Sequence, residues 1–195
     1  MNPPSTQPSS GSYASRTRRA EYVQAMKALA ADRRPDTPVR VYVSVPPTVM
    51  ARETWPTRLE AIRTALPAGV ELLYYATAFP ADADWDQAWP AFSPTLDGLV
   101  LIGKRTKPGS MSPTLQLGPV ARKELRTIVA RRRPVLLHTY EFGLVPIVDC
   151  RPHRRGSEGR ERLKLRVPDG WDSDSATLQA ALEALRPVES ERSGE

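Results

Sequence analysis

One glutamate stands where an apolar side chain is expected. Residues 118–134 (GPVARKELRTIVARRRP) predict a helix that opens with Gly118 and Pro119. Proline is favourable in the first turn because the amide groups there have no hydrogen-bond partner within the helix, so the missing N–H costs nothing. At about 100° per residue, Glu124 falls inside the apolar arc of this helix, which is formed by Val120, Ala121, Leu125, Ile128 and Val129. An inward carboxylate is costly unless it is paired or reaches a polar cavity, so Glu124 is a candidate catalytic residue. The alternative is that Glu124 skirts the interface and pairs with a cation such as Arg131.

The elements that must position Glu124 alternate between strands and helices. We expect strands at 39–45, 70–76, 96–103 and 134–140, with a fifth candidate at 144–149, and helices at 17–34, 55–66, 84–92, 118–134 and 174–186. Such alternation is typical of right-handed crossovers and a parallel sheet with helices on both faces. The sequence therefore predicts an α/β fold: a single Rossmann-like (flavodoxin-like) three-layer sandwich with a mainly parallel sheet of four or five strands.

The expected organisation has a core domain and two flexible extensions. Residues 1–16 are rich in Pro, Ser, Gln and Asn and are expected to be a disordered tail. Residues 17–37 form a helix and linker, and residues 38–150 form the core. Residues 151–186 form a basic loop and a C-terminal helix, with a candidate edge strand at 163–167, and residues 187–195 form a second tail.

Composition excludes several classes of protein. The 195 residues are 40% hydrophobic and 26% charged, as in a soluble domain. The absence of a long apolar stretch or signal peptide predicts a cytoplasmic protein with no membrane contact. A single cysteine, Cys150, allows no disulfide within the chain and agrees with a reducing compartment. The spacing of Cys150, His138 and His153 is not that of metal ligands, so we expect no metal site. There is no GxGxxG, Walker A or GxSxG sequence, so we expect no cofactor, no dinucleotide or P-loop site and no hydrolase elbow.

The net charge of +6 is unevenly distributed. The stretch Arg151–Arg166 carries seven Arg or Lys residues against two glutamates, and a second cluster contains Lys104, Arg105 and Lys107. Such clusters attract the phosphates of a nucleotide or of a nucleic acid. The alternative is that they form ordinary solvated surface.

A ligand of this fold is expected at the carboxyl ends of the parallel strands, where helices also begin. The segments 44–48, 77–86, 104–118 and 138–143 converge there. The candidate binding residues are polar or lie at a helix start: Ser44, Asp84, Lys104, Ser110, Ser112, Gly118 and His138. For His138 the alternative is a core histidine whose hydrogen bonds are made within the protein. For the loop serines the alternative is exposure to solvent.

Three segments follow one another in an informative order. Asp97-Gly-Leu-Val-Leu-Ile forms a strand, Leu117-Gly-Pro-Val-Ala-Arg-Lys-Glu124-Leu begins a helix, and Arg132-Arg133-Pro134-Val135-Leu136-Leu137 leads into the next strand. This order resembles the nucleoside 2-deoxyribosyltransferase family and the related deoxynucleoside monophosphate N-glycosidases, over residues 39–140. One departure is that Arg122, Lys123 and Arg126 surround the glutamate where small residues are common. These cations favour a phosphorylated ligand or indicate that activity has been lost.

The resemblance implies roles for three carboxylates. Glu124 would attack the anomeric carbon of the sugar and form a covalent glycosyl-enzyme, as in a retaining glycosidase. Asp97 would orient the pocket, and Asp86 or Asp84 would protonate or hold the departing base. The alternatives are a turn residue that opens a strand for Asp97, and charges at a helix start for Asp84 and Asp86.

The expected function is therefore N-glycosidic cleavage or transfer on a (deoxy)nucleoside or nucleoside 5′-monophosphate. Two alternatives stay open: a non-catalytic nucleotide sensor of the same fold, and a nucleic-acid-associated accessory protein that binds through Arg151–Arg166. The resemblance also implies a homo-oligomer whose neighbouring subunits complete the pocket.

Overall fold

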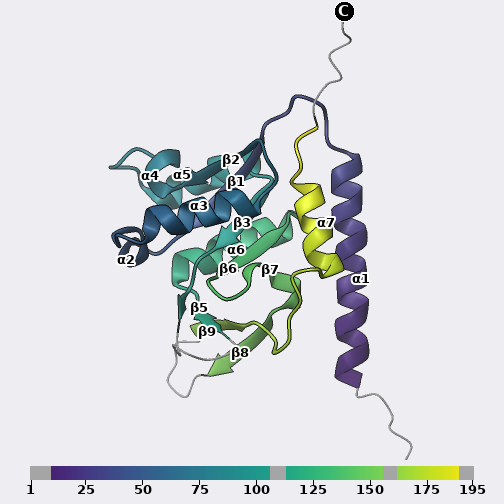
Figure 1. Cartoon of the computed structure of the whole chain (residues 1–195). Coiled ribbons are helices and arrows are strands. Elements are labelled where there is room, and N and C mark those ends of the chain that lie inside the picture. The colour runs from purple at the N-terminus through teal and green to yellow at the C-terminus, as the bar shows by residue number, and fades with distance from the viewer. Residues whose placement is uncertain (1–9, 106–112, 156–161, 189–195) are drawn as a thin grey trace, which may run out of the picture.

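A mainly parallel sheet of five strands lies at the centre of the computed structural model, which describes residues 10–105, 113–155 and 162–188 (Figure 1). In spatial order the strands are β2 (Val70–Tyr74), β1 (Val39–Ser44), β3 (Gly98–Leu101), β6 (Val135–Thr139) and β7 (Gly143–Pro146). The first four are parallel, and β7 is antiparallel to β6. Only residues 140–142 separate β6 from β7, which is too short for a parallel crossover. The mixed α/β fold with a mainly parallel sheet is confirmed.

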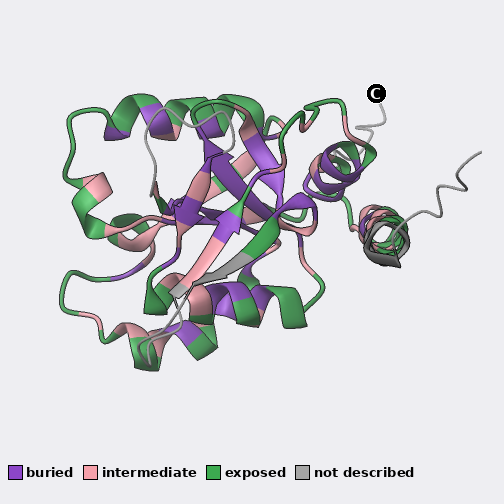
Figure 2. Cartoon of the chain, turned by 90° about the horizontal axis from the view of Figure 1, so that it is seen from below, coloured by how far each residue is buried: buried purple, intermediate pink, exposed green. Residues whose placement is uncertain are grey.

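Helices cover both faces of this sheet (Figure 2). One face carries α3 (Trp55–Ala65) and α7 (Ala176–Ala184), and the other carries α5 (Trp85–Phe92) and α6 (Pro119–Ala130). Successive strand residues point to opposite faces. In β1, therefore, Val41 packs with Ile62 of α3, while Tyr42 packs with Trp89 of α5. The short elements are α2 (Pro47–Met50), α4 (Tyr75–Ala78) and the 3-10 turns η1 (Ser93–Thr95) and η2 (Ile147–Asp149).

A second, antiparallel sheet replaces two expected loops. Its order is β4 (Lys104–Arg105), β5 (Thr114–Gln116), β9 (Arg162–Arg166) and β8 (Arg151–Arg155). The prediction of a basic loop was therefore wrong for residues 151–155, which form β8, while residues 156–161 lie outside the described residues. The candidate edge strand at 163–167 corresponds to β9 and belongs to this sheet rather than to the central one. The physical reason is alternation: Leu163, Leu165 and Val167 pack on the core of the α5–α6 face, while charged residues lie between them.

The N-terminal helix begins earlier than expected. Helix α1 (Ser10–Ala31) enters the segment that was expected to be disordered, so that boundary was wrong. No proline occurs between Pro8 and Pro35 to stop the helix. It packs outside α7, where the buried Met26 contacts Ala180 and Ala184 (Figure 1).

A buried carboxylate joins α1, η2 and α7. Asp149, whose side chain is 3% exposed, lies at the end of η2, and its Oδ1 is 2.8 Å from Nε of Arg19 in an ion pair without hydrogen-bond geometry. Its Oδ2 accepts hydrogen bonds from Nε1 of Trp171 at 3.1 Å and from Oγ1 of Thr177 at 2.5 Å. Because these partners come from three segments, Asp149 holds α1 and α7 against the sheet.

We therefore expect Asp149→Ala to lower the free energy of unfolding by about 2–4 kcal/mol, since it leaves buried donors without an acceptor. Urea unfolding followed by circular dichroism measures the change. The matched control is Asp169→Ala, whose exposed side chain pairs with Arg166 and should change stability by less than about 0.5 kcal/mol. Equal losses in the two variants would contradict this role of Asp149.

Candidate active site

Glu124 lies on the face of α6 that packs against the sheet, and it is 1% exposed. The helix begins at Pro119 after the N-cap residue Gly118, so Glu124 is in its second turn. Ser44 at the end of β1 and Trp85 at the start of α5 both lie beside the carboxylate. Arg131, the alternative partner, instead donates to the carbonyl of Pro94 at 2.9 Å. The carboxylate is thus inside the fold, at the edge of the sheet where the parallel strands end.

The electrostatics of Glu124 are those of a poorly compensated buried acid. Burial raises its pKa to about 7, and the nearby Ser44 hydroxyl and Trp85 indole act in the opposite direction. These two donors are close, but Oε2 of Glu124 and Nε1 of Trp85 both lack a partner of hydrogen-bond geometry among the described residues. No cation contributes to this pKa. Buried polar groups are almost always paired, so this arrangement keeps Glu124 as the candidate catalytic residue.

An aromatic cluster removes water from one side of the carboxylate. Tyr42 is 2% exposed and contacts the rings of Phe79, Trp89 and Phe92. Burial, with a contribution from the Glu124 charge, raises the pKa of Tyr42. Trp85 stacks on Trp89 with ring centroids 5.3 Å apart. The cluster supplies the apolar surroundings that keep Glu124 partly protonated at neutral pH.

Two of the cations of α6, Lys123 and Arg126, are turned away from Glu124. Lys123 Nζ is 2.6 Å from Oδ1 of Asp86 and 5.1 Å from the centroid of the Trp85 ring, and Arg126 is exposed. The Asp86 side chain is 75% exposed. Asp84 is the N-cap of α5 and accepts a hydrogen bond from the amide of Asp86 at 2.9 Å. Asp84 and Asp86 therefore lie at the start of α5, in agreement with the alternative interpretation that they are charges at a helix start.

Asp97 is at the opposite edge of the sheet from Glu124. It immediately precedes β3, so it lies where the parallel strands begin, whereas Ser44 and Glu124 lie where they end. Its Oδ2 accepts from the amide of Arg40 at 3.0 Å and its Oδ1 from Nη2 of Arg33 at 3.3 Å. The structure therefore does not bring Asp97 into one pocket with Glu124, and we correct that expectation.

The remaining candidates are spread over several places. Lys104 is exposed in β4, Gly118 is exposed at the start of α6, and Ser110 and Ser112 lie outside the described residues. His138 is buried on the other face of the sheet, where its Nδ1 accepts from Nε of Arg58 at 3.0 Å. Ser44 is the one predicted binding residue that the described structure places beside Glu124.

Sequence reasoning missed Arg58, and it considered Trp85 for the core or for stacking on a base but not as a neighbour of Glu124. Arg58 is 7% exposed on α3 and lies one turn before Ile62, within the apolar face of that helix. The signal that identified Glu124, a charge inside an apolar arc, would have identified Arg58 as well.

Comparisons with protein-family models, curated proteins and solved structures give no significant match to this chain. Among the residues that the structure describes, no helix combines the length and apolar character needed to cross a membrane. Within the same residues, no group of three or more His, Cys, Asp or Glu side chains is arranged to hold a metal ion. The function must therefore be inferred from the site itself.

The raised pKa predicts that Glu124 destabilises the protein at neutral and alkaline pH. The pKa of this carboxyl is about 7 in the folded protein and has its ordinary value of 4.5 in the unfolded chain, so stability falls as pH rises between the two values. We expect Glu124→Gln to raise the free energy of unfolding at pH 8 by up to roughly 3 kcal/mol, and to have little effect at pH 4.5. Urea unfolding at both pH values measures the difference. Glu60→Gln, a change at an exposed site on α3, should show no such difference. A Glu124→Gln variant that gains no stability between pH 4.5 and pH 8 would contradict the assignment.

Proposed function

We propose that this protein cleaves or transfers the N-glycosidic bond of a (deoxy)nucleoside or nucleoside 5′-monophosphate, with Glu124 as the nucleophile. The observation that carries the proposal is a carboxylate that is 1% exposed, has no cation acting on it and lies where the parallel strands end. Burial of such a carboxylate lowers the stability of the fold, and a catalytic role is the best physical reason for its presence.

The architecture supports the location of this site. The strand order β2-β1-β3-β6-β7 corresponds to 2-1-3-4-5, the order of flavodoxin-like doubly wound sheets, which bind ligands at the carboxyl ends of the strands. We therefore propose that the fold is Rossmann-like in this sense. The sequence resemblance selects the same residue, Glu124, without using its burial. Two separate arguments thus support one carboxylate.

The proposed reaction has two steps. Ionised Glu124 attacks the anomeric carbon, a C–O bond forms, and the N-glycosidic bond breaks with its electron pair passing to the base nitrogen, which takes a proton from water. In the second step, water or a second base attacks the same carbon and loses a proton to solvent, the ester bond breaks, and the carboxylate is regenerated. With a pKa of about 7, about half of the Glu124 side chains are ionised at neutral pH, and the carboxylate is more basic than an exposed one.

The neighbouring groups have positioning roles in this proposal. The Ser44 hydroxyl and the Trp85 indole lie beside the carboxylate and favour its ionised form. They would hold one oxygen while the other attacks. Asp97 is not part of this mechanism, since its carboxylate is engaged by Arg33 and Arg40 at the other edge. We place the activity in the cytoplasm, where nucleotides are available.

The test is release of free base. We expect the protein to release base from at least one common deoxynucleoside or its 5′-monophosphate, measured by liquid chromatography. Glu124→Gln should lower the rate at least about a thousand-fold, because the covalent path is lost. Glu60→Gln, an identical change at an exposed site, should retain the full rate. Mass spectrometry of acid-quenched protein should locate a glycosyl adduct on the peptide that contains Glu124.

Two outcomes would overturn the enzymatic proposal. Base release that persists in Glu124→Gln would exclude Glu124 as the nucleophile. Calorimetric binding of a nucleotide with no base release from any of these compounds would instead favour the non-catalytic sensor.

A further inference from the structure

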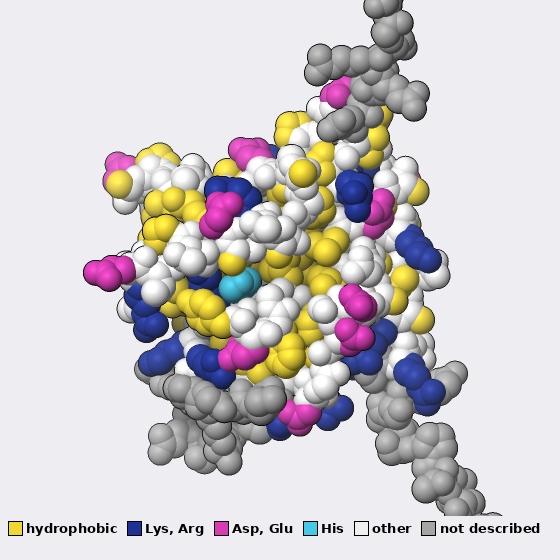
Figure 3. All heavy atoms as spheres, viewed as in Figure 1, with side chains coloured by type: hydrophobic (Ala, Val, Ile, Leu, Met, Phe, Trp, Pro, Cys, Tyr) yellow, Lys and Arg dark blue, Asp and Glu magenta, His cyan; other side chains and the backbone are white. Residues whose placement is uncertain are grey.

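A cavity of about 420 Å³ opens on the α3 face of the sheet, away from Glu124. It lies between the start of α3 and the end of β6, and its lining includes Thr54, Thr57, Arg58, His138 and Tyr140. In Figure 3 one histidine side chain is visible among basic and hydrophobic side chains; His138, which is 4% exposed, is the only histidine whose side chain the structure describes. The sheet separates this cavity from the candidate active site.

Arg58 places a buried positive charge in this cavity without a carboxylate beside it. The residue is 7% exposed. Its Nε donates to Nδ1 of His138 and its Nη2 to the His138 carbonyl, both at 3.0 Å. The guanidinium also lies 4.4 Å from the centroid of the Tyr140 ring and interacts with the Tyr140 hydroxyl, so these partners are neutral groups and none is a carboxylate. The carboxylate whose charge reaches Arg58, Glu141, is itself paired with Arg105. A buried cation without its own counter-ion is costly, and a bound anion would remove that cost.

His138 supplies a second donor. Because Nδ1 accepts the hydrogen bond from Arg58, the neutral ring carries its proton on Nε2. Burial, together with the charge of Arg58, lowers the pKa of His138 to about 4, so the ring is neutral at physiological pH. No described residue accepts a hydrogen bond from Nε2, which leaves this donor for a ligand.

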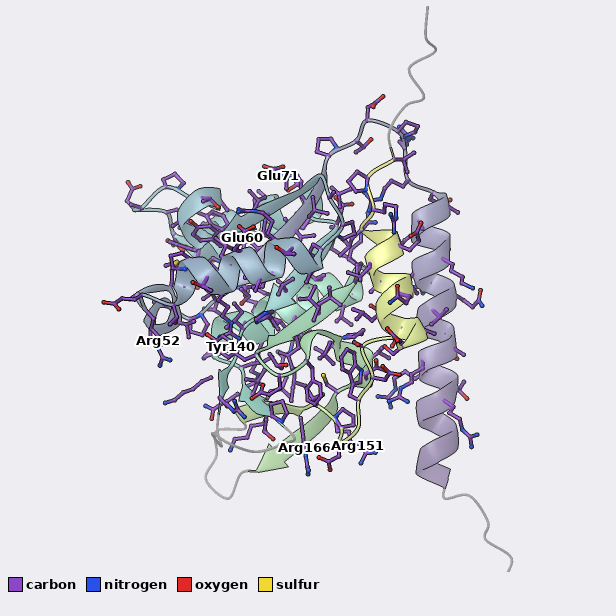
Figure 4. All side chains as sticks on the ribbon, in the orientation of Figure 1. Arg52, Glu60, Glu71, Tyr140, Arg151 and Arg166 are labelled. Atoms are coloured by element: carbon purple, nitrogen blue, oxygen red, sulfur yellow. The ribbon has the colours of Figure 1, made fainter. Side chains whose placement is uncertain are left out.

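Two threonines add hydroxyl groups at the start of α3. Thr54 is the N-cap residue, but its side chain caps no backbone amide, and both Thr54 and Thr57 are exposed in the lining of the cavity. Arg52, whose charge acts on Arg58, adds a further cation. In Figure 4, Tyr140 lies below α3, while Glu60 is on the opposite side of that helix, where it pairs with Arg63. The cavity therefore combines one buried cation with several hydrogen-bond donors and has no carboxylate among the described residues of its lining.

We propose that this cavity binds a phosphate group, with Arg58 as the charge partner and the Thr54 and Thr57 hydroxyls and His138 Nε2 as additional donors. Several donors around one buried guanidinium suit an oxyanion with more than two acceptor oxygens. The phosphate is either the free ion or the monoester of a sugar phosphate. The site is independent of the reaction proposed for Glu124, since it lies on the other face of the sheet.

Two probes, inorganic phosphate and ribose 5-phosphate, test the site at pH 7 and constant ionic strength. We expect saturable binding by calorimetry. In nitrogen-15 NMR, the His138 ring should keep its Nε2–H tautomer while its pKa rises, because a bound anion stabilises the imidazolium form. Tighter binding of ribose 5-phosphate would identify the monoester as the ligand, and tighter binding of inorganic phosphate would identify the free ion.

The matched variants are Arg58→Gln and Arg63→Gln, which make the same change at a buried and an exposed position of α3. Arg58→Gln should weaken phosphate binding at least tenfold, and Arg63→Gln should leave it unchanged. If Arg58→Gln fails to fold, Thr57→Val removes one exposed hydroxyl and should weaken binding about threefold. Absence of binding, a His138 resonance that phosphate does not move, or equal binding of acetate would each overturn the proposal.

Discussion

Successive side chains of a strand point to opposite faces of the sheet, and this alternation determines which side chains lie on each face at the carboxyl ends of the strands. Ser44 ends β1 on the face covered by α6, and His138 lies near the end of β6 on the face covered by α3. Each is joined by one charged residue from the helix that covers it, Glu124 in the first case and Arg58 in the second. The sheet itself keeps these opposite charges apart. Two polar sites of different character therefore arise at one edge.

This separation has an energetic cost on both sides of neutral pH. Glu124 lowers stability as pH rises from 4.5 through 7, because the folded protein holds its proton longer than the unfolded chain does. His138 acts in the opposite sense: its folded pKa of about 4 lies below the ordinary value of 6.5, so stability is lost as pH falls through that interval. The two contributions partly offset each other between pH 4.5 and 6.5. Such a cost is characteristic of groups that are retained for binding or catalysis.

Periodicity made most of the central architecture predictable, because buried strands and amphipathic helices differ in spacing. The same analysis placed Glu124 inside the fold. It failed for β8: residues 151–155 (RPHRR) form a strand although their charge suggested a loop. It also failed for Asp97, since a residue that precedes a parallel strand lies at the edge opposite to the ligand. Arg58 was missed because only the apolar residues on its face of the helix were considered. The second sheet could not be predicted because its strands pair between distant segments, and no local sequence pattern encodes that pairing.

The surroundings of Glu124 argue against a purely structural carboxylate. Helix α6 carries cations within two positions on either side of it, and a small change in helical phase would have brought one of them to the acid. Instead Lys123 pairs with the exposed Asp86, and Arg126 faces solvent. The groups that do reach the carboxylate are neutral donors, Ser44 and Trp85. A neutral donor orients a carboxylate without cancelling its charge. That charge then stays available to an electron-poor carbon, which is the requirement that a glycosyl-transfer nucleophile has to meet.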